Sequence, residues 1–363
     1  EHIAEHFTYE DDRLWFQDLD RGLPRMGDQV NEQRIREISR YDLYAKLASA
    51  LQADHTTAYI LDKRVGHMTD LWTTPLWESD LLVGVRDADD VLWMYPKRAQ
   101  HGLLAGELPF YLQGTPALLV NLPMLLDDVA PNPLFADLPQ EHASASQRVV
   151  EYQLKVWSDR TITADARVFL SGQFSTLGRS SYQRNSMDAL VDPRYGDVLA
   201  PLLGVDTTRW DVRAKSLDAP FRFQAVTSNS FPLPLGPGAE DELTVDLKPL
   251  LVHVVPDGFV ADTRHLPFYW DMLQHDRSVV ELHFEDPIEL VNGQELSFEA
   301  STGNSSVQRT VQQTGPYEVR VESRFQVTGE REGPEQFVQL EEVIQRVNRN
   351  NAVLRVRILP DRP

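Results

Sequence analysis

A change of pattern at Arg148 limits the folds open to this chain more than any other feature. Apolar and polar residues alternate from Val150 to Val156, and 161–170 continues in the same way. A period of two places successive side chains on opposite faces of a strand, so this segment predicts two paired β-strands. We expect the C-terminal part to be mostly antiparallel and sandwich-like. Further strands are predicted at 210–214, 221–226, 243–247, 279–284, 317–325 and 353–358, and an amphipathic helix at 336–348.

The first 126 residues follow another pattern. Apolar residues recur at helical spacing within 25–39 and within 41–53. Strand-like runs follow, and two of them, 81–86 and 91–94, flank the polar turn Asp87–Asp90, which predicts an antiparallel hairpin. Helices followed by antiparallel strands are typical of an α+β domain.

The chain of 363 residues is long enough for several domains. Residues 127–147 are polar and contain prolines, which predicts a linker. We therefore predict an α+β domain over 1–126, a β-rich domain with a helical insertion over 148–261, and a C-terminal β module with one helix over 262–363.

Composition excludes several classes of function. The net charge of −20 argues against nucleic-acid partners, which require a cationic surface. There is no cysteine, which excludes thiol nucleophiles, disulfides and Cys-zinc sites. The ten histidines are scattered along the chain and are better explained as surface or hydrogen-bonded core residues, so we predict no metal and no cofactor. The sequence has no apolar run long enough for a transmembrane helix.

Several segments resemble the bacterial transglutaminase-like family, which has a papain-type fold. Gly106–Pro109 and then Gln113–Leu118 resemble the family's Gly-x-Leu-Pro-x-x-x-Gln-Gly-x-x-Ala-Leu tail. Asp42–Leu51 resembles the helix after the nucleophile, and the predicted hairpin resembles the strands that carry the catalytic His and Asp. The C-terminal part is similar to the β module of unknown function that follows this core in exported proteins.

The resemblance implies that the catalytic residues are missing. A papain-type site needs a thiolate, an imidazole and a carboxylate. By the resemblance, the Cys position falls at Arg40, the His position at Asp80 and the Asp position at Tyr95. The Arg guanidinium is always protonated and cannot act as a nucleophile. We hypothesise that Arg40 and Asp80 form an ion pair beside Tyr95 that fills the former site; the alternative is that these side chains face solvent and never meet.

We therefore predict a pseudoenzyme, a non-catalytic pseudo-transglutaminase that binds protein or peptide or acts as a scaffolding module. The resemblance implies a periplasmic or cell-envelope location. Trp72, Trp77 and Trp270 are candidates for a binding surface, although core positions would equally explain them. Two alternatives remain open: a hydrolase or transferase with a non-cysteine site, or a purely structural subunit of an envelope assembly. Candidate groups for such a site are Ser39, Ser79 and His101.

Overall fold

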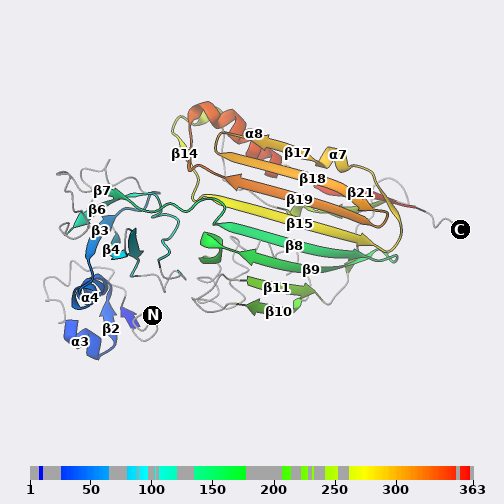
Figure 1. Cartoon of the computed structure of the whole chain (residues 1–363). Coiled ribbons are helices and arrows are strands. Elements are labelled where there is room, and N and C mark those ends of the chain that lie inside the picture. The colour runs from blue at the N-terminus through cyan, green and yellow to red at the C-terminus, as the bar shows by residue number, and fades with distance from the viewer. Residues whose placement is uncertain are drawn as a thin grey trace. The chain divides into compact units, whose positions relative to one another are not determined.

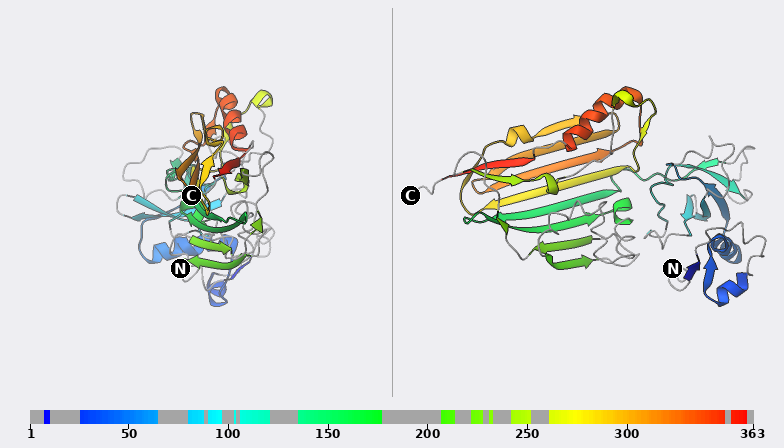
Figure 2. Two further views of the ribbon diagram at one scale, coloured as in Figure 1. Left: turned by 90° about the vertical axis from the view of Figure 1, so that its right-hand side faces the viewer. Right: turned by 180° about the vertical axis from the view of Figure 1, so that it is seen from behind.

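The computed structural model divides the chain into two compact units, Glu1–Gln140 and Glu141–Pro363, each described here by itself. Most of the regular structure is antiparallel β (Figures 1 and 2). None of the helices described could span a membrane. The structure describes residues 8–10, 26–64, 80–87, 90–96, 103, 106–120, 135–176, 207–213, 222–227, 231–232, 242–251, 261–348 and 352–359.

The N-terminal unit contains a five-stranded antiparallel sheet with the order β5-β4-β3-β6-β7. The predicted hairpin is confirmed, since β4 and β5 pair in antiparallel register. One face carries a hydrophobic cluster that includes Ile60, Leu82 and Trp93. The strands are β3 (His55–Ile60), β4 (Asp80–Asp87), β5 (Asp90–Met94), β6 (Pro116–Val120) and β7 (Phe135–Asp137).

The prediction of one continuous helix over 25–39 is wrong. Helix α3 (Met26–Asn31) ends early, and a short strand, β2 (Arg34–Arg36), pairs in parallel with β1 (Thr8–Glu10). Gln33 has φ 53°, a left-handed conformation that does not continue a right-handed helix. The next helix, α4 (Glu37–Ala50), therefore starts earlier than expected.

Helix α4 buries only part of the apolar face predicted for it. The spacing within 41–53 placed Leu43, Leu47, Ala50 and Leu51 on one face, but Leu47 and Leu51 are 41% and 79% exposed. Leu43 is buried as predicted, together with Tyr41 and Ala48, and α4 contacts β3 and β4. Polar and apolar residues on this helix are mixed, so spacing alone did not identify the face toward the sheet.

A nine-stranded sheet dominates the C-terminal unit, with the order β10-β11-β9-β8-β15-β19-β18-β17 and β12 beside β9. All neighbours are antiparallel except β8 and β15, which are parallel (Figure 1). The strands are β8 (Gln147–Val156), β9 (Thr161–Leu170), β10 (Thr207–Arg213), β11 (Arg222–Thr227), β12 (Phe231–Pro232), β15 (Gln274–Phe284), β17 (Phe298–Ser301), β18 (Ser305–Gly315) and β19 (Glu318–Val327).

Two hydrophobic clusters cover this sheet. One contains residues of the large sheet and of a second sheet with the order β13-β21-β16. The other lies under α8 (Phe337–Asn348), which contacts β17 and β18. The remaining elements are β13 (Glu242–Asp246), β16 (Ile288–Leu290), β21 (Val353–Ile358), β14 (Phe268–Tyr269), β20 (Arg331–Glu332), α7 (Gly293–Leu296), and the 3-10 turns η5 (Lys248–Leu250), η6 (Ala261–Thr263) and η7 (Pro334–Gln336).

The domain boundaries differ from those predicted. The modules expected over 148–261 and 262–363 share one sheet, because β8 from the first pairs with β15 from the second. The predicted linker 127–147 contains β7, which pairs with β6, and the start of β8. The chain therefore changes unit at residue 140, and one nine-stranded sheet joins the two modules predicted after it.

Candidate functional site

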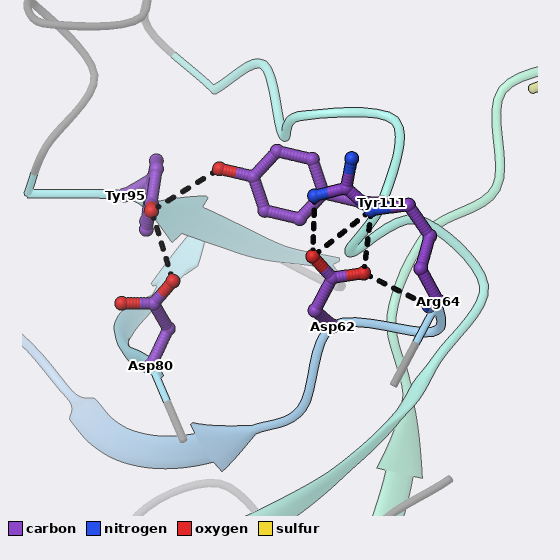
Figure 3. Close-up of polar contacts among 5 residues, drawn as sticks. All are labelled: Asp62, Arg64, Asp80, Tyr95 and Tyr111. Atoms are coloured by element: carbon purple, nitrogen blue, oxygen red, sulfur yellow. Dashed lines mark hydrogen bonds and ion pairs between the residues drawn. The ribbon is translucent and has the colours of Figure 1, made fainter. Parts of the chain in front are cut away.

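Polar side chains gather at one end of the five-stranded sheet in the N-terminal unit. Because neighbouring strands are antiparallel, β3 ends, β4 begins and β5 ends at the same edge. Asp62 follows β3, Asp80 opens β4 and Tyr95 follows β5. Tyr111 comes from the turn before β6, whose first residue reaches the same edge. Four separate segments thus converge there (Figure 3).

The central contact joins Tyr95 to Asp80. The Tyr95 hydroxyl donates a hydrogen bond to Asp80 Oδ2 at 3.0 Å and lies 3.5 Å from the Tyr111 hydroxyl. Tyr95 is only 2% exposed. Burial first, and then the charge of Asp80 and the hydroxyls of Tyr111 and Tyr41, raise the pKa of Tyr95. The phenol therefore stays protonated and acts as a donor.

The neighbouring Asp62–Arg64 pair supports Tyr111. Arg64 Nε lies 2.9 and 3.0 Å from the two Asp62 carboxylate oxygens, and Nη2 lies 2.5 Å from Oδ2. This fork holds the guanidinium carbon 4.8 Å from the Tyr111 ring centre and 5.4 Å from the Phe110 ring centre. Such cation–π contacts contribute about 0.5–1 kcal/mol at exposed sites. The pair therefore fixes the ring whose hydroxyl faces Tyr95 (Figure 3).

The structure brings two of the three predicted triad positions together. Asp80 and Tyr95, which stand at the same sheet edge, are hydrogen-bonded. Arg40 lies in α4 directly before Tyr41, whose hydroxyl is near enough to affect the pKa of Tyr95. The Arg40 side chain lies outside the described part of the chain, so its predicted ion pair with Asp80 stays a prediction.

Sequence reasoning missed Asp62, Arg64 and Tyr111. No catalytic motif contains them, and an acid followed two residues later by a base is common in turns. Their position was nevertheless informative, since Asp62 and Arg64 come just after 57–61, one of the strand-like runs, and Tyr111 lies inside the Gly106–Leu118 segment. Side chains at strand ends of one edge meet even when they are distant in sequence.

This cluster has the chemistry of a stabilising hydrogen-bond network rather than of a nucleophile activated by a base. A triad passes a proton from a nucleophile to a base that an acid orients. Here the carboxylate accepts from a phenol whose raised pKa keeps its proton in place. Within the described ranges, no three His, Asp or Glu side chains lie close enough to hold a metal.

Two serine–histidine contacts occur elsewhere among the described residues. Ser49 Oγ lies 3.3 Å from His55 Nε2, and Ser144 Oγ lies 3.0 Å from His142 Nδ1. The other nitrogen of His55 contacts the Ala53 carbonyl at 3.0 Å. In the part of the chain that the structure covers, neither imidazole is hydrogen-bonded to a carboxylate. The side chains of the candidates Ser39, Ser79 and His101 lie outside the described residues.

Trp270, the one residue of the predicted tryptophan surface that the structure describes, is buried. Trp270 is 8% exposed and packs 4.9 Å from the Phe268 ring and 5.5 Å from the Phe325 ring. Its indole N–H donates to Glu332 at 3.4 Å. The prediction that Trp270 lines a surface is wrong, because its apolar ring completes the cluster under α8. Trp72 and Trp77 lie outside the described residues.

Comparisons with known proteins show a distant likeness of fold. No protein-family model and no curated protein matches the chain. A solved structure described as a "putative protease" from Parabacteroides distasonis is similar, with a TM-score of 0.50 and 9% sequence identity. The match covers 98% of this chain and 50% of that one, so the chain spans about half the length of the protein it matches. At this identity the likeness concerns the fold alone.

Proposed function

We propose that this chain is a non-catalytic pseudo-transglutaminase that acts as a protein- or peptide-binding or scaffolding module of the bacterial cell envelope. One observation carries the proposal. The resemblance equates Asp80 and Tyr95 with the catalytic His and Asp, and the Tyr95 hydroxyl is hydrogen-bonded to Asp80 Oδ2 at 3.0 Å. The envelope location rests on the resemblance.

The chemistry of that contact supports a role without turnover. Removing one member of a catalytic triad lowers turnover by several orders of magnitude. Here the chain has no cysteine at all, and the resemblance places Arg40, Asp80 and Tyr95 at all three positions. The hydrogen bond and the burial of Tyr95 hold this end of the sheet in one arrangement, which suits a surface that binds without reacting.

A serine hydrolase is the second candidate, and the Ser49–His55 contact favours it. The distant structural neighbour is described as a putative protease, and that description applies to the neighbour alone. The Ser49 hydroxyl also lies 3.0 Å from the Ala45 carbonyl, the usual back-bond of a helical serine. A hydroxyl has one proton, so donation to Ala45 excludes donation to His55. We therefore rank this candidate second.

The test combines loss and restoration of chemistry. The native chain is assayed for hydrolysis of ester and amide probes and for glutamine–lysine transamidation, and we expect no turnover. In the variant Arg40→Cys/Asp80→His/Tyr95→Asp we expect measurable amide turnover, and none when Arg40 is replaced by serine in the same background. Circular dichroism checks that each variant is folded. Turnover by the native chain that disappears in Ser49→Ala would instead establish the second candidate.

A further inference from the structure

A pocket of about 530 Å³ lies in the C-terminal unit between the edge of β18 and the segment that contains α7. This volume falls within the range typical of ligand sites. Helix α7 contacts both β18 and β21 (Figure 1). The lining residues are Leu290, Val291, Asn292, Gly293, Gln294, Glu295, Val311, Gln312 and Gln313.

One wall of the pocket is a strand edge that the described sheet leaves open. Strand β17 pairs with β18 only along Ser306–Arg309, and no described strand pairs with that edge of β18 beyond it. The Val311 N–H donates to Ser297 Oγ at 3.0 Å, on the side away from β19. Backbone groups of alternate residues in a strand point to the same side. Gln313 therefore presents its N–H and C=O to the pocket edge, where an added strand would pair.

The pocket walls are held in place by side chains that are already bonded. Gln313 Nε2 donates to the Ile288 carbonyl at 2.8 Å, and its Oε1 accepts from the Leu290 N–H at 3.0 Å. Asn292 bonds in the same two-way manner to the backbone of β21, at Val353 and Arg355. A site whose walls are fixed before binding loses less entropy when it is filled.

Two further carboxamides, Gln294 and Gln312, line the pocket from exposed positions on its two walls. A carboxamide offers both a donor and an acceptor, so it can pair with both polar groups of a peptide unit. None of the described residues that line the pocket is aromatic, so they offer no stacking surface of the kind that sugar rings favour. The lining therefore suits a peptide backbone better than a glycan.

Gly293 sets the width of the pocket. A Cβ at this position would lie 2.5 Å from Leu290 Cδ2 and 3.4 Å from the Val311 carbonyl oxygen. Glycine thus allows the α7 segment to approach β18 closely. Gly315, at the end of the same strand, offers a matched control, since the nearest atom to its Cβ would be 3.7 Å away.

We propose that this pocket binds an extended peptide segment, which adds to the free edge of β18 and pairs with the backbone of Gln313 and the carboxamides of Gln294 and Gln312. The inference rests on the proposed peptide-binding function and names the site and the class of ligand.

The probe is a pool of random peptides of about ten residues, long enough for one strand. Peptides retained by the full chain are resynthesised with a fluorescent label, and Kd is measured by anisotropy. Each backbone amide is then methylated in turn. Because Gln313 is the residue of this edge that the proposal leaves for pairing, one backbone amide of the added strand donates to its carbonyl. We expect methylation of that amide to weaken binding by about tenfold or more and of its two sequence neighbours by less than about threefold. Hydrogen exchange at the Gln313 amide should slow when peptide is bound.

Variants locate the site. We expect Gly293→Val to weaken binding by about tenfold or more and Gly315→Val to leave Kd within about twofold. Gln312→Trp, which adds bulk at an exposed position, should reproduce the loss and serves if Gly293→Val fails to fold. Bound peptide whose affinity depends on no single backbone amide, or that is unaffected by both pocket variants, would overturn the site while leaving peptide binding intact. The oligosaccharide chitohexaose is tested in parallel as a glycan probe. If the chain retains no peptide, or retains chitohexaose instead, the peptide-binding function is overturned together with the site.

Discussion

The two units use polar side chains in different places. In the N-terminal unit, Asp62, Asp80 and Tyr95 stand at strand ends and meet at one edge of the sheet. In the C-terminal unit, charged residues lie in the middle of long strands and pair across them, as Arg320 does with Glu281 on the neighbouring strand. Strand-end clusters bring together residues from many segments, which suits a site. Mid-strand pairs join residues already in register, which suits a scaffold.

The register of the large sheet shows how mid-strand charge pairs join neighbouring strands. Arg148 and Asp276 stand directly opposite each other on β8 and β15, and so do Glu281 and Arg320 on β15 and β19. A slip of one residue would move every side chain to the other face and separate both pairs. Charges in this unit therefore specify one alignment of strands that are distant in sequence.

The largest effect that sharpens the comparison is expected from Asp276→Ala. Arg148 Nε lies 2.9 Å from Asp276 Oδ1, and the side chains are 13% and 3% exposed. Removing one partner of a buried pair leaves the other charge poorly solvated, so we expect the free energy of unfolding to fall by about 3–5 kcal/mol. Urea unfolding followed by circular dichroism measures the change.

The control is Glu281→Ala, which removes a half-exposed cross-strand pair and should cost less than about 1 kcal/mol. The double variant Arg148→Met/Asp276→Leu should recover most of the loss, because a packed apolar pair replaces the ions. Equal losses for Asp276→Ala and Glu281→Ala would contradict the idea that burial makes the first pair important.

The next effect concerns packing below the strand-end cluster. Gly84 on β4 is buried, and an added Cβ would lie 2.9 Å from both Trp93 Cζ3 and Val91 Cγ1. We expect Gly84→Ala to lower the free energy of unfolding of the N-terminal unit by about 1–3 kcal/mol through overpacking. Gly27→Ala, whose Cβ meets nothing within 4 Å, should be neutral or slightly stabilising. Thermal unfolding compares them, and a neutral Gly84→Ala would show that Trp93 moves freely.

The central contact itself is expected to contribute less. Tyr95→Phe removes the hydroxyl that donates to Asp80, while the half-buried Asp80 can still reach water. We expect a loss of about 1–2 kcal/mol in the free energy of unfolding. Tyr59→Phe on β3, whose hydroxyl has no partner among the described residues, should change it by less than about 0.5 kcal/mol. Similar values for the two variants would mean that the Tyr95–Asp80 bond does not hold this edge.

Sequence reasoning found elements whose pattern is local. The alternation of 150–156 predicted β8, and the apolar residues at helical spacing predicted α8 almost to the residue. It missed β18, because in Ser305–Gly315 only Val307 and Val311 are large and apolar, and they are four residues apart. That spacing matches a helix as well as a strand.

Contacts between distant segments left no local trace. Arg148 and Asp276 are 128 positions apart, and nothing in either segment indicates the parallel pairing of their strands. In the candidate site, the family resemblance singled out Asp80 and Tyr95, whereas Tyr111 lies within the Gly106–Leu118 segment but belongs to no catalytic motif. Its role depends on Arg64, which stacks against its ring, and that contact exists only in the fold.

The smallest expected effect is a pH dependence that belongs to the C-terminal unit. Burial tends to raise the pKa of Glu322, but hydrogen bonds from Arg277 and Arg324, with their charges, lower it to about 2. An unfolded chain takes up this proton near its ordinary pKa of about 4.3. The stabilisation is therefore present above about pH 4.3 and is lost as the pH falls toward 2. Because Glu322 is only partly buried, we expect about 1 kcal/mol. Urea unfolding from pH 7 to 2 should show Glu322→Gln less stable at pH 7, with the difference from the native chain shrinking toward zero as the pH falls to 2. Glu299→Gln, at an exposed position of β17, should follow the native curve throughout. If the free energies of unfolding of the native chain and of Glu322→Gln change in parallel with pH, the mid-strand charges specify register without adding to stability.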